Sequence, residues 1–540
     1  MKRKHSSKLI QHLGILAGVC KEIRLAELID RYVDNGERKV TVGEAVVAMV
    51  LNAMGFTGRP LYLTPRFYES RPVDTLIREG LSSADFHDYS LGTALDTLYE
   101  QGITELFFQV ASQILTEQGI DTRFAHLDST TFSVYGQYNS EAEEVGDGVI
   151  HITKGYSKDN APELNQVVAQ MISVNKTSIP LWIEALSGNS NDKKAFRETV
   201  RKFQKQFCED EMPFMVADSA FYTKENITGC GDEIKWVSRV PETIKDVRDL
   251  YRSLADEDMV RIGGGYRYTR VGSEYADVHQ RWLLIFSEKA YQREMKTFRK
   301  NLEKELEKKE RELKHLRNSP YACAEDAEKA AQAFSRKLKH LQFQYHVYEK
   351  PYYEGKGRPK AGSTPSSVSW FIDGSLEYDE QRVEVDRQRK GKFVVATNVL
   401  DEEVLSDERI IEVYKDQNVS VERGFRFMKD PLFYADRLFL KKPERVMALI
   451  MIMTLSLLVY SLAERRIRSA LKKEGTHIWN QKNKPTDKPT ARWVFTIFED
   501  VLLLYIHGED GITVEAMNLR AEHEIVINSL GEHYRKMYFL

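Results

Sequence analysis

The pattern of hydrophobic and polar positions divides the chain into a helical stretch and a strand-rich stretch. Over residues 40–53, apolar side chains recur at helical spacing, and a second helical pattern covers 91–115. Gly55 and Pro60 lie between the two patterns and interrupt them. We therefore predict an all-α N-terminal domain over residues 1–118.

From Thr122 the pattern changes to short apolar runs that are typical of β-strands. The runs predicted to be strands are FAHLD (124–128), VIHITKGYS (149–157), VAQMISV (168–174), IPLWIEAL (179–186), FMVADSAFY (214–222) and KWVSRVP (235–241). A short helix is expected after Thr223, whose side chain can cap a helix N-terminus. Two of the strands end in a carboxylate, at Asp128 and Asp218. Residues 119–240 are therefore predicted to form the first part of a mixed α/β sheet.

Residues 241–390 differ in pattern from the strands before them. The segment 266–287 alternates like the strands of a β-hairpin, and 288–346 is charge-dense with an apolar stripe at helical spacing. Pro320 interrupts this helical pattern. We predict a β-rich lobe, inserted into the sheet domain, that carries an antiparallel helical hairpin over about 288–350. The alternative is a charged, solvent-exposed spacer with no function of its own.

The sheet is predicted to resume at KFVVATNV (392–399), so that residues 391–470 form the second part of the sheet domain. Two helices should follow this strand, one from about Asp407 and another from about Ser420. Residues 471–540 are predicted to form a C-terminal helical region.

One run, residues 446–463, has no charged residue and is eighteen residues long, the lower edge of a membrane-spanning length. Basic residues flank both of its ends, so no charge asymmetry would orient it in a bilayer. We therefore favour a fully buried core helix and predict no membrane association.

Composition and charge narrow the class of protein. The chain has 540 residues, 42% of them hydrophobic and 29% charged, which excludes a fibrous or largely disordered protein. The net charge is −3, from 78 Lys+Arg and 81 Asp+Glu, but residues 411–495 hold 17 basic and 9 acidic residues. A local basic excess is typical of a nucleic-acid surface. The four cysteines form no CxxC pair, which excludes a zinc ribbon and a disulfide framework and favours a reducing cytoplasm.

The stretch 421–429 places one acid and two bases on a helical face. Its apolar positions form a buried stripe, and Glu422, Arg426 and Lys429 share the neighbouring face. If this helix packs across the two strand ends that carry aspartates, three carboxylates converge. Hard divalent cations prefer oxygen ligands, and two such ions about 4 Å apart support displacement at a phosphodiester. We predict a site for two Mg²⁺ ions, with Mn²⁺ as a substitute. The residues predicted to be both catalytic and metal-binding are Asp128, Asp218 and Glu422.

These motifs resemble those of the DDE transposases of bacterial and archaeal insertion sequences. Asp128 lies in HLDSTTFSVYG, Asp218 in MVADSAFY and Glu422 in VERGFRFMKDPLF. The family's Gly-aromatic-Ser-Lys-Asp stretch is present as GYSKD (155–159). The three acidic motifs occur in the family's order and with matching strand context, which makes the resemblance specific.

The resemblance also implies residues that contact DNA. The extended Tyr–Arg–Glu–Lys signature of a related insertion-sequence group is kept at Tyr414, Glu422 and Lys429, while Gln417 stands near the expected arginine. The absence of the expected arginine puts a contact with a DNA strand in question, and it does not affect the predicted metal site. The residues expected to contact DNA are Tyr414, Arg423, Arg426, Lys429 and Lys158.

What the resemblance implies for the whole chain is an α/β fold. A ribonuclease-H-like mixed sheet flanked by helices would combine with the all-α domain and the inserted β-rich lobe. The implied function is a DNA transposase that binds terminal inverted repeats, cuts DNA by metal-assisted hydrolysis and joins the freed 3′-hydroxyl to target DNA. Because transposition pairs two DNA ends, a homodimer or higher multimer is expected, which the N-terminal domain or the helical hairpin would support. The expected location is the cytoplasm, associated with the nucleoid.

Two other functions stay open. One is a hydrolytic nuclease on the same core that lacks strand transfer, and the other is a catalytically inactive DNA-binding derivative. The residues also have ordinary interpretations, since an aspartate at a strand end is commonly a turn residue. Glu422 is spaced as a surface partner of Arg426. His126, on the same strand face as Asp128, is expected to be a core histidine or a support for the site rather than a ligand.

Overall fold

The chain folds into two compact units. Unit 1 comprises residues 1–238, 275–278 and 397–540, and unit 2 comprises 239–274 and 279–396. The predicted domain boundaries at 118, 240, 390 and 470 stay predictions. The computed structural model describes residues 4–539 except 59, 135–137, 139–147, 158–160, 175–177, 191, 209–210, 232, 254–258, 355–363, 431, 434–439, 441 and 509–510, and the side chains of 4, 192–194 and 417–422 are also outside the description.

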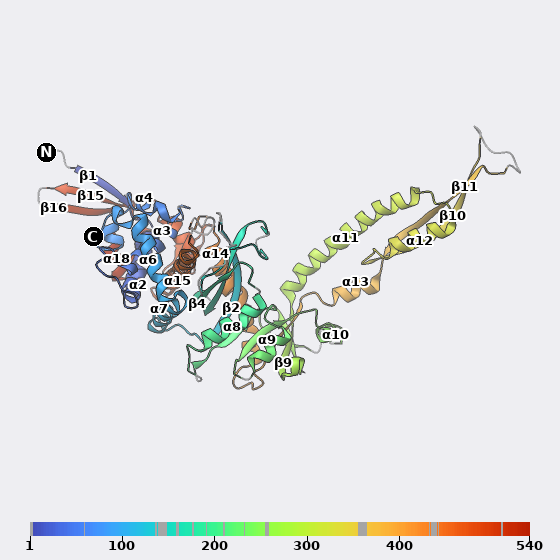
Figure 1. Ribbon diagram of the computed structural model, residues 1–540, viewed down its shortest axis with the longest axis horizontal. Coiled ribbons are helices and arrows are strands. Elements are labelled where there is room, and N and C mark those ends of the chain that lie inside the picture. Colours follow the sequence, from blue (N-terminus) through green and yellow to red (C-terminus); the bar gives the residue numbers. More distant parts are fainter. Residues whose placement is uncertain are drawn as a thin grey trace. The chain divides into compact units, whose positions relative to one another are not determined.

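Unit 1 contains the strands of a mixed sheet in the order β4-β3-β2-β5-β6; Figure 1 labels β4 and β2. β2 (Phe124–Val134) pairs antiparallel with β3 (Asn165–Val174), which pairs antiparallel with β4 (Ile179–Ser187). On its other side β2 pairs in parallel with β5 (Phe214–Ala217), and β5 pairs in parallel with β6 (Trp236–Val240). The predicted mixed α/β sheet is confirmed.

Two helices of unit 1 follow these strands. α8 (Asp192–Gln204) comes after β4, and α9 (Lys224–Cys230) comes after β5. As predicted, Thr223 caps α9, since its hydroxyl oxygen accepts the backbone N–H of Asn226 at 3.3 Å.

The strand predicted over 149–157 is wrong. Among its described residues, the segment forms one isolated bridge, between Thr153 and Gln166 at the start of β3. The backbone N–H of Gly188, just after β4, donates to the carbonyl of His151 at 2.9 Å. The segment therefore forms single hydrogen-bonded contacts with the start of β3 and with the residue after β4, and it does not pair along either strand.

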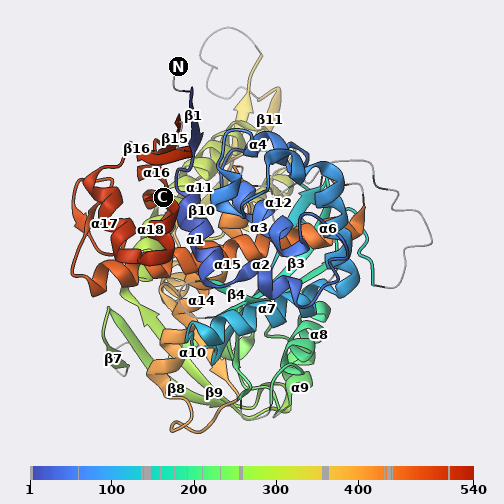
Figure 2. The same ribbon diagram turned by 90° about the vertical axis from the view of Figure 1, so that its left-hand side faces the viewer.

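The N-terminal region is helical, as predicted. Its helices are α1 (Leu13–Glu22), α2 (Leu25–Asp30), α3 (Val42–Ala53), α4 (Thr64–Tyr68), α5 (Val73–Leu76), α6 (Asp88–Gln101) and α7 (Ile103–Glu117). A capping box begins α3, because the Thr41 hydroxyl oxygen accepts the Glu44 N–H at 3.1 Å and the Glu44 carboxylate accepts the Thr41 N–H at 3.1 Å. Four of these helices, α1, α3, α6 and α7, pack on α15 (Pro443–Lys473) (Figure 2).

The long apolar helix α15 is the core of unit 1. By length and composition alone it could cross a membrane, but 89% of its most apolar 18-residue window is buried inside the structure. It also packs against β4 and against α14 (Asp407–Met428). The prediction of a buried core helix over 446–463 is confirmed.

The C-terminal region was predicted to be helical, and it also contains strands. Its elements are β13 (Ile478–Trp479), β14 (Pro485–Thr486), α16 (Ala491–Ile497), β15 (Leu502–Gly508), β16 (Gly511–Met517), α17 (Ala521–Leu530) and α18 (Glu532–Tyr538). β15 pairs with β16 and also with β1 (Lys4–Leu9), at the opposite end of the sequence (Figure 1). The N-terminal region is therefore not all-α. A pairing between such distant segments leaves no local pattern that would predict it.

Helix α18 docks closely on α1. A Cβ atom on Gly14 would lie 2.6 Å from Cζ of Tyr538, and one on Gly18 would lie 2.7 Å from Cδ1 of Tyr534. The Tyr538 hydroxyl donates to the carbonyl of Gln11 at 2.6 Å. The two glycines in α1 therefore let the tyrosine rings of α18 lie directly on the helix backbone.

Unit 2 contains the remaining strands and helices. Its sheet strands have the order β12-β9-β8-β7, and the hairpin strands predicted over 266–287 are present as β8 and β9. The elements are α10 (Lys245–Ser253), β7 (Val260–Ile262), β8 (Tyr266–Ser273), β9 (Gln280–Ser287), α11 (Glu288–Asn318), α12 (Ala324–Ser335), β10 (Leu341–Tyr352), β11 (Ser367–Tyr378), α13 (Glu380–Arg387) and β12 (Lys392–Thr397).

The two helices α11 and α12 pack on a ribbon formed by β10 and β11. The prediction extended the helical hairpin to about 350, but the helices end at Ser335 and β10 follows. Alternate residues of β10, Phe343, Tyr345 and Val347, pack against buried residues of the helices and of β11. This period of two, in a run otherwise rich in polar residues, was the signal for a strand.

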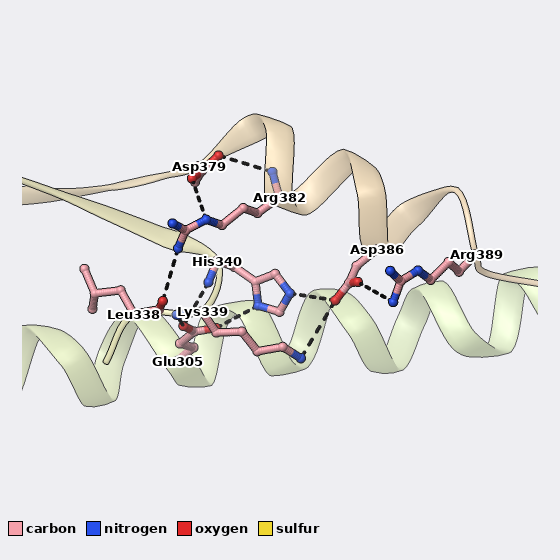
Figure 3. Close-up of polar contacts among 8 residues, drawn as sticks. All are labelled: Glu305, Leu338, Lys339, His340, Asp379, Arg382, Asp386 and Arg389. Carbon is pink, nitrogen blue, oxygen red and sulfur yellow. Dashed lines mark hydrogen bonds and ion pairs between the residues drawn. The ribbon is translucent and has the colours of Figure 1, made fainter. Parts of the chain in front are cut away.

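His340 joins three segments of unit 2 just before β10 (Figure 3). Its side chain is buried, and Nδ1 lies 2.9 Å from Oε2 of Glu305 on α11 while Nε2 lies 2.9 Å from Oδ2 of Asp386 on α13. Burial raises the pKa of both carboxyl groups. It is outweighed by the hydrogen bonds from His340 acting together with backbone N–H donors at Glu305 and with the charges of Arg389 and Lys339 at Asp386, so each pKa lies below its ordinary value. The histidine therefore fastens the start of the ribbon to two helices.

Candidate active site

Asp128 and Asp218 lie side by side along two adjacent strands. The parallel register of β2 and β5 ends with Leu127 opposite Ala217, and the next residue on each chain is one of the two aspartates. Neighbouring strands lie about 4.8 Å apart, so the two carboxylates start from neighbouring backbone positions. The structure thus brings together two of the three carboxylates that the sequence predicted to meet.

The local chain fixes both carboxylates. Oδ1 of Asp128 accepts the backbone N–H of Ser129 at 2.7 Å, and Oδ1 of Asp218 accepts the N–H of Ala220 at 2.9 Å. The Ser238 hydroxyl on β6 donates to the carbonyl of Asp218 at 3.0 Å and holds the strand end in place. Asp218 is exposed directly after the end of β5, as predicted. Asp128 is half-buried within β2, which continues to Val134, so the prediction that this strand ends at Asp128 is wrong.

Helix α14 runs along β2 past this pair. Near the start of the helix, Cζ of Arg409 lies 4.8 Å from the ring centroid of Phe124, and near its end Nζ of Lys429 lies 5.9 Å from that of Phe132. The first and last thirds of the helix thus face the two ends of the strand. The helix is continuous over Asp407–Met428, so the prediction of a separate helix from about Ser420 is wrong.

Helix α14 packs closely on the sheet beside Asp128. A Cβ atom on Gly424 would lie 3.0 Å from Cε of Met171, and Met171 pairs with Asp128 across β2 and β3. Glu422 is two residues earlier on the same helix, and its side chain lies outside the described residues. The structure therefore brings the helix to Asp128, while the meeting of all three carboxylates stays a prediction.

The two aspartates, which lie where the ladder between β2 and β5 ends, fit a hard divalent cation. Both aspartates offer carboxylate oxygens, which Mg²⁺ and Mn²⁺ prefer. His126, the nearest imidazole along β2, is buried at 2% exposure, as expected of a core histidine. No group of three His, Cys, Asp or Glu able to hold a metal occurs among the described side chains, a set that does not include Glu422.

The residues predicted to contact DNA lie in different surroundings. Arg426 is exposed on α14, and Lys429 is half-buried just after it; their contact with DNA stays a prediction. Tyr414 is buried at 8% exposure, which does not suit a contact with DNA. Lys158 lies outside the described residues.

Arg423 is engaged inside the protein. Its Nη2 lies 2.7 Å from both carboxylate oxygens of Glu464 on α15, and Glu464 is only 5% exposed. Burial alone would lower the pKa of Arg423, but the attraction and hydrogen bonding to Glu464 and Tyr460 together outweigh burial and raise that pKa. Glu464 also pairs with Arg468 at 2.8 Å and accepts the backbone N–H of Ala491 at 2.9 Å. This network fastens α14, one residue after Glu422, to the core helix.

The sequence reasoning missed this network. Glu464 is the first charged residue after the apolar run 446–463, which marks an acid at the edge of a buried helix. Such an acid requires a cationic partner. The sequence did not reveal which of the many arginines nearby supplies it.

Comparisons with known proteins agree with the sequence motifs. The family model described as "Transposase DDE domain" matches residues 121–459, well over half of the chain. A model described as a domain of unknown function (DUF4277) matches residues 5–112. No curated protein matches the sequence. A cryo-EM structure of a piggyBac transposase synaptic complex with hairpin DNA is similar over 92% of this chain and 83% of that chain, at a TM-score of 0.37 and 8% identity, values too low to carry an argument.

Proposed function

The chain belongs to the DDE transposase family, and we propose that it binds the terminal inverted repeats of an insertion sequence, cuts DNA there and joins the freed 3′-hydroxyl to target DNA. The observation that supports this chemistry is the placement of Asp128 and Asp218 at adjacent positions on parallel strands. One site suffices for cutting and joining, because both steps are displacements at phosphorus.

In this proposal Asp128, Asp218 and Glu422 hold two divalent ions, Mg²⁺ with Mn²⁺ as a substitute. When bound, such ions activate a water or a 3′-hydroxyl and stabilise the leaving oxygen. The chain's own contribution is orientation, since the backbone N–H bonds at Oδ1 fix the plane of each aspartate carboxylate. Arg426 and Lys429, on and just after α14, bind the flanking phosphates.

The partners in this proposal are DNA and further copies of the chain. Two ends of an element must be held together for transposition, so the active form is a homodimer or a higher multimer on DNA. The protein then works in the cytoplasm, on chromosomal DNA.

The test uses a labelled duplex that carries the repeats flanking the gene, with Mg²⁺ or Mn²⁺ and a target plasmid. Asp128→Asn and Asp218→Asn should each lower cleavage and joining at least 100-fold and leave DNA affinity unchanged, because the amide keeps the side-chain shape and loses the charge. Asp401→Asn is the matched control. Asp401 is exposed and its Oδ1 accepts the Glu403 N–H at 2.8 Å, the same local turn as at Asp218.

The two alternatives give different products in this assay. Cleavage without joined products would identify a hydrolytic nuclease. Binding of the repeats without cleavage under any divalent ion would identify an inactive DNA-binding derivative. Full activity in both aspartate variants would rule out the proposed site.

A further inference from the structure

Unit 2 contains a cavity that the proposed chemistry does not use. Its volume is about 660 Å³, within the range of about 300–1,000 Å³ usual for ligand sites. It is open to solvent and is lined by the end of α10, strands β8 and β9, the start of α11 and the segment from α13 to β12. None of its lining residues belongs to unit 1, which carries Asp128 and Asp218.

The described side chains that line the cavity are predominantly basic. The cationic ones are Arg252, Arg267, Arg387, Lys390 and Lys392, and the acidic ones are Glu288 and Glu384. Both acids are already engaged nearby: Glu384 pairs with Arg387 at 2.6 Å, and Glu288 accepts a hydrogen bond from Gln292 at 3.1 Å. Cationic side chains therefore outnumber acidic ones by five to two among the described residues that line the cavity, and such a surplus attracts an anion.

Aromatic rings hold part of this charge in position. Cζ of Arg267 lies 4.4 Å from the ring centroid of Phe286, a cation–π contact that restrains the guanidinium. The ring of Phe286 lies 5.6 Å from that of Tyr291. Gly391 has a φ of +74°, and a Cβ there would lie 2.7 Å from Cβ of Tyr291, so the chain at this wall is closely packed. These contacts therefore restrain Arg267 and the wall of the cavity next to it.

Two buried polar side chains also line the cavity. Tyr251 is 1% exposed, and its hydroxyl has no hydrogen-bond partner among the described residues. Lys392 is 9% exposed. Burial raises the pKa of Tyr251, so the phenol stays protonated at neutral pH and can donate a hydrogen bond. A buried donor without a partner is rare in proteins and indicates a missing ligand or water.

We propose that this cavity binds one phosphate group of a DNA strand, with Arg267 and Lys392 supplying the charge and the Tyr251 hydroxyl donating a hydrogen bond to a phosphate oxygen. The assignment to DNA rests on the proposed function. A phosphate in a polymer also explains the aromatic wall, on which the attached sugar or base can lie.

The experiment measures DNA affinity of the full-length protein by fluorescence anisotropy, using a labelled duplex of mixed sequence at several salt concentrations. Arg267→Gln combined with Lys392→Gln should weaken binding roughly tenfold and reduce the slope of log K against log salt by about 0.9, the value for one phosphate. The matched control is Arg299→Gln combined with Lys308→Gln, because both residues are exposed on α11 and outside the cavity. The control should keep the wild-type slope.

A second variant keeps the test valid if the charge change disturbs folding. Tyr251→Phe removes one oxygen that has no partner among the described residues, so the melting temperature should not fall. Its DNA affinity should nevertheless fall roughly threefold or more, because a hydrogen bond to the phosphate is lost. Unchanged affinity in this variant and in the double variant would overturn the proposal.

The outcomes separate this proposal from the proposed function. If the wild type binds and cuts DNA while the cavity variants match it in affinity and salt slope, the cavity assignment is wrong and the function stands. If the wild type neither binds nor cuts DNA, both are wrong. If inorganic phosphate raises the melting temperature of the wild type but not of Arg267→Gln, and DNA affinity is equal in the two, the ligand is a free phosphate and the DNA assignment fails.

Discussion

Replacing Glu464 with glutamine should loosen the helix that carries the predicted catalytic glutamate. Glu464 contacts Arg423 at 2.7 Å through both oxygens and Arg468 at 2.8 Å, and it accepts the N–H of Ala491 at 2.9 Å. Arg423 follows Glu422 directly on α14. The substitution keeps the size of the side chain and removes the negative charge with which both arginines form ion pairs.

The size of the effect follows from burial. Removing one partner of a fully buried ion pair costs about 3–5 kcal/mol, because the other charge stays buried and uncompensated. Here the side chain of Arg423 keeps 36% exposure and that of Arg468 keeps 29%, so water compensates part of the loss. We therefore expect the free energy of unfolding to fall by about 2–3 kcal/mol.

Urea unfolding and DNA cleavage test this expectation together. Glu464→Gln and Arg423→Gln should each lower the free energy of unfolding and slow cleavage, with DNA affinity unchanged. The double variant should lose less than the sum of the two, because the two residues share one contact. Glu474→Gln, an exposed glutamate at the end of the same helix, is the control and should behave like the wild type.

A different result for Arg423→Gln would contradict this prediction. If Arg423→Gln weakens DNA binding, reduces its salt dependence and leaves stability unchanged, then Arg423 contacts DNA, as the sequence suggested, and the ion pair has no structural role.

Three further outcomes are expected. Gly18→Ala should cost about 1–3 kcal/mol of stability, because the new Cβ would lie 2.7 Å from a tyrosine ring of α18, whereas Gly272→Ala, with open space around it, should cost less in the same thermal unfolding experiment. The stability difference between wild type and His340→Ala should be full above the ordinary carboxyl pKa values of Glu305 and Asp386, 4.5 and 3.8. It should shrink as the pH falls, because both carboxyl groups have lowered pKa values and lose their charge at low pH, and a difference that stays constant in urea titrations from pH 7 to about pH 3 would contradict this. Chelation of divalent ions with EDTA should abolish cleavage and preserve binding of the repeats, and cleavage that persists in EDTA would exclude the metal site.

The sequence predicted the sheet and the two aspartates because both depend on local patterns. A strand is recognised from its own apolar residues, and Asp128 and Asp218 each follow such a run. Their adjacency follows from the parallel register of β2 and β5, whose ladder ends one residue before each aspartate, although β2 itself continues past Asp128 to Val134. The same reasoning placed Glu422 on a helix, and that helix does pack against β2.

The features that the sequence did not predict depend on distant partners. Arg423 was assigned to DNA because its charge was visible and its partner, Glu464 on another helix, was not. β1 is six residues long and partly polar, and it is a strand because β15 offers an edge to pair with. In β10, apolar and polar residues alternate as in a strand. The predicted helical hairpin nevertheless includes most of this strand, because the charged helical pattern comes directly before it.

The pairing of β1 with β15 has a consequence for the timing of folding. Lys4 is bonded opposite His507, so the ribosome must add about 500 residues after the first strand before its partner exists. At roughly 10 residues per second, this takes close to a minute. The sheet of β1, β15 and β16 therefore assembles only at the end of synthesis. Until then, a nascent or truncated polypeptide exposes the unpaired edge of β1.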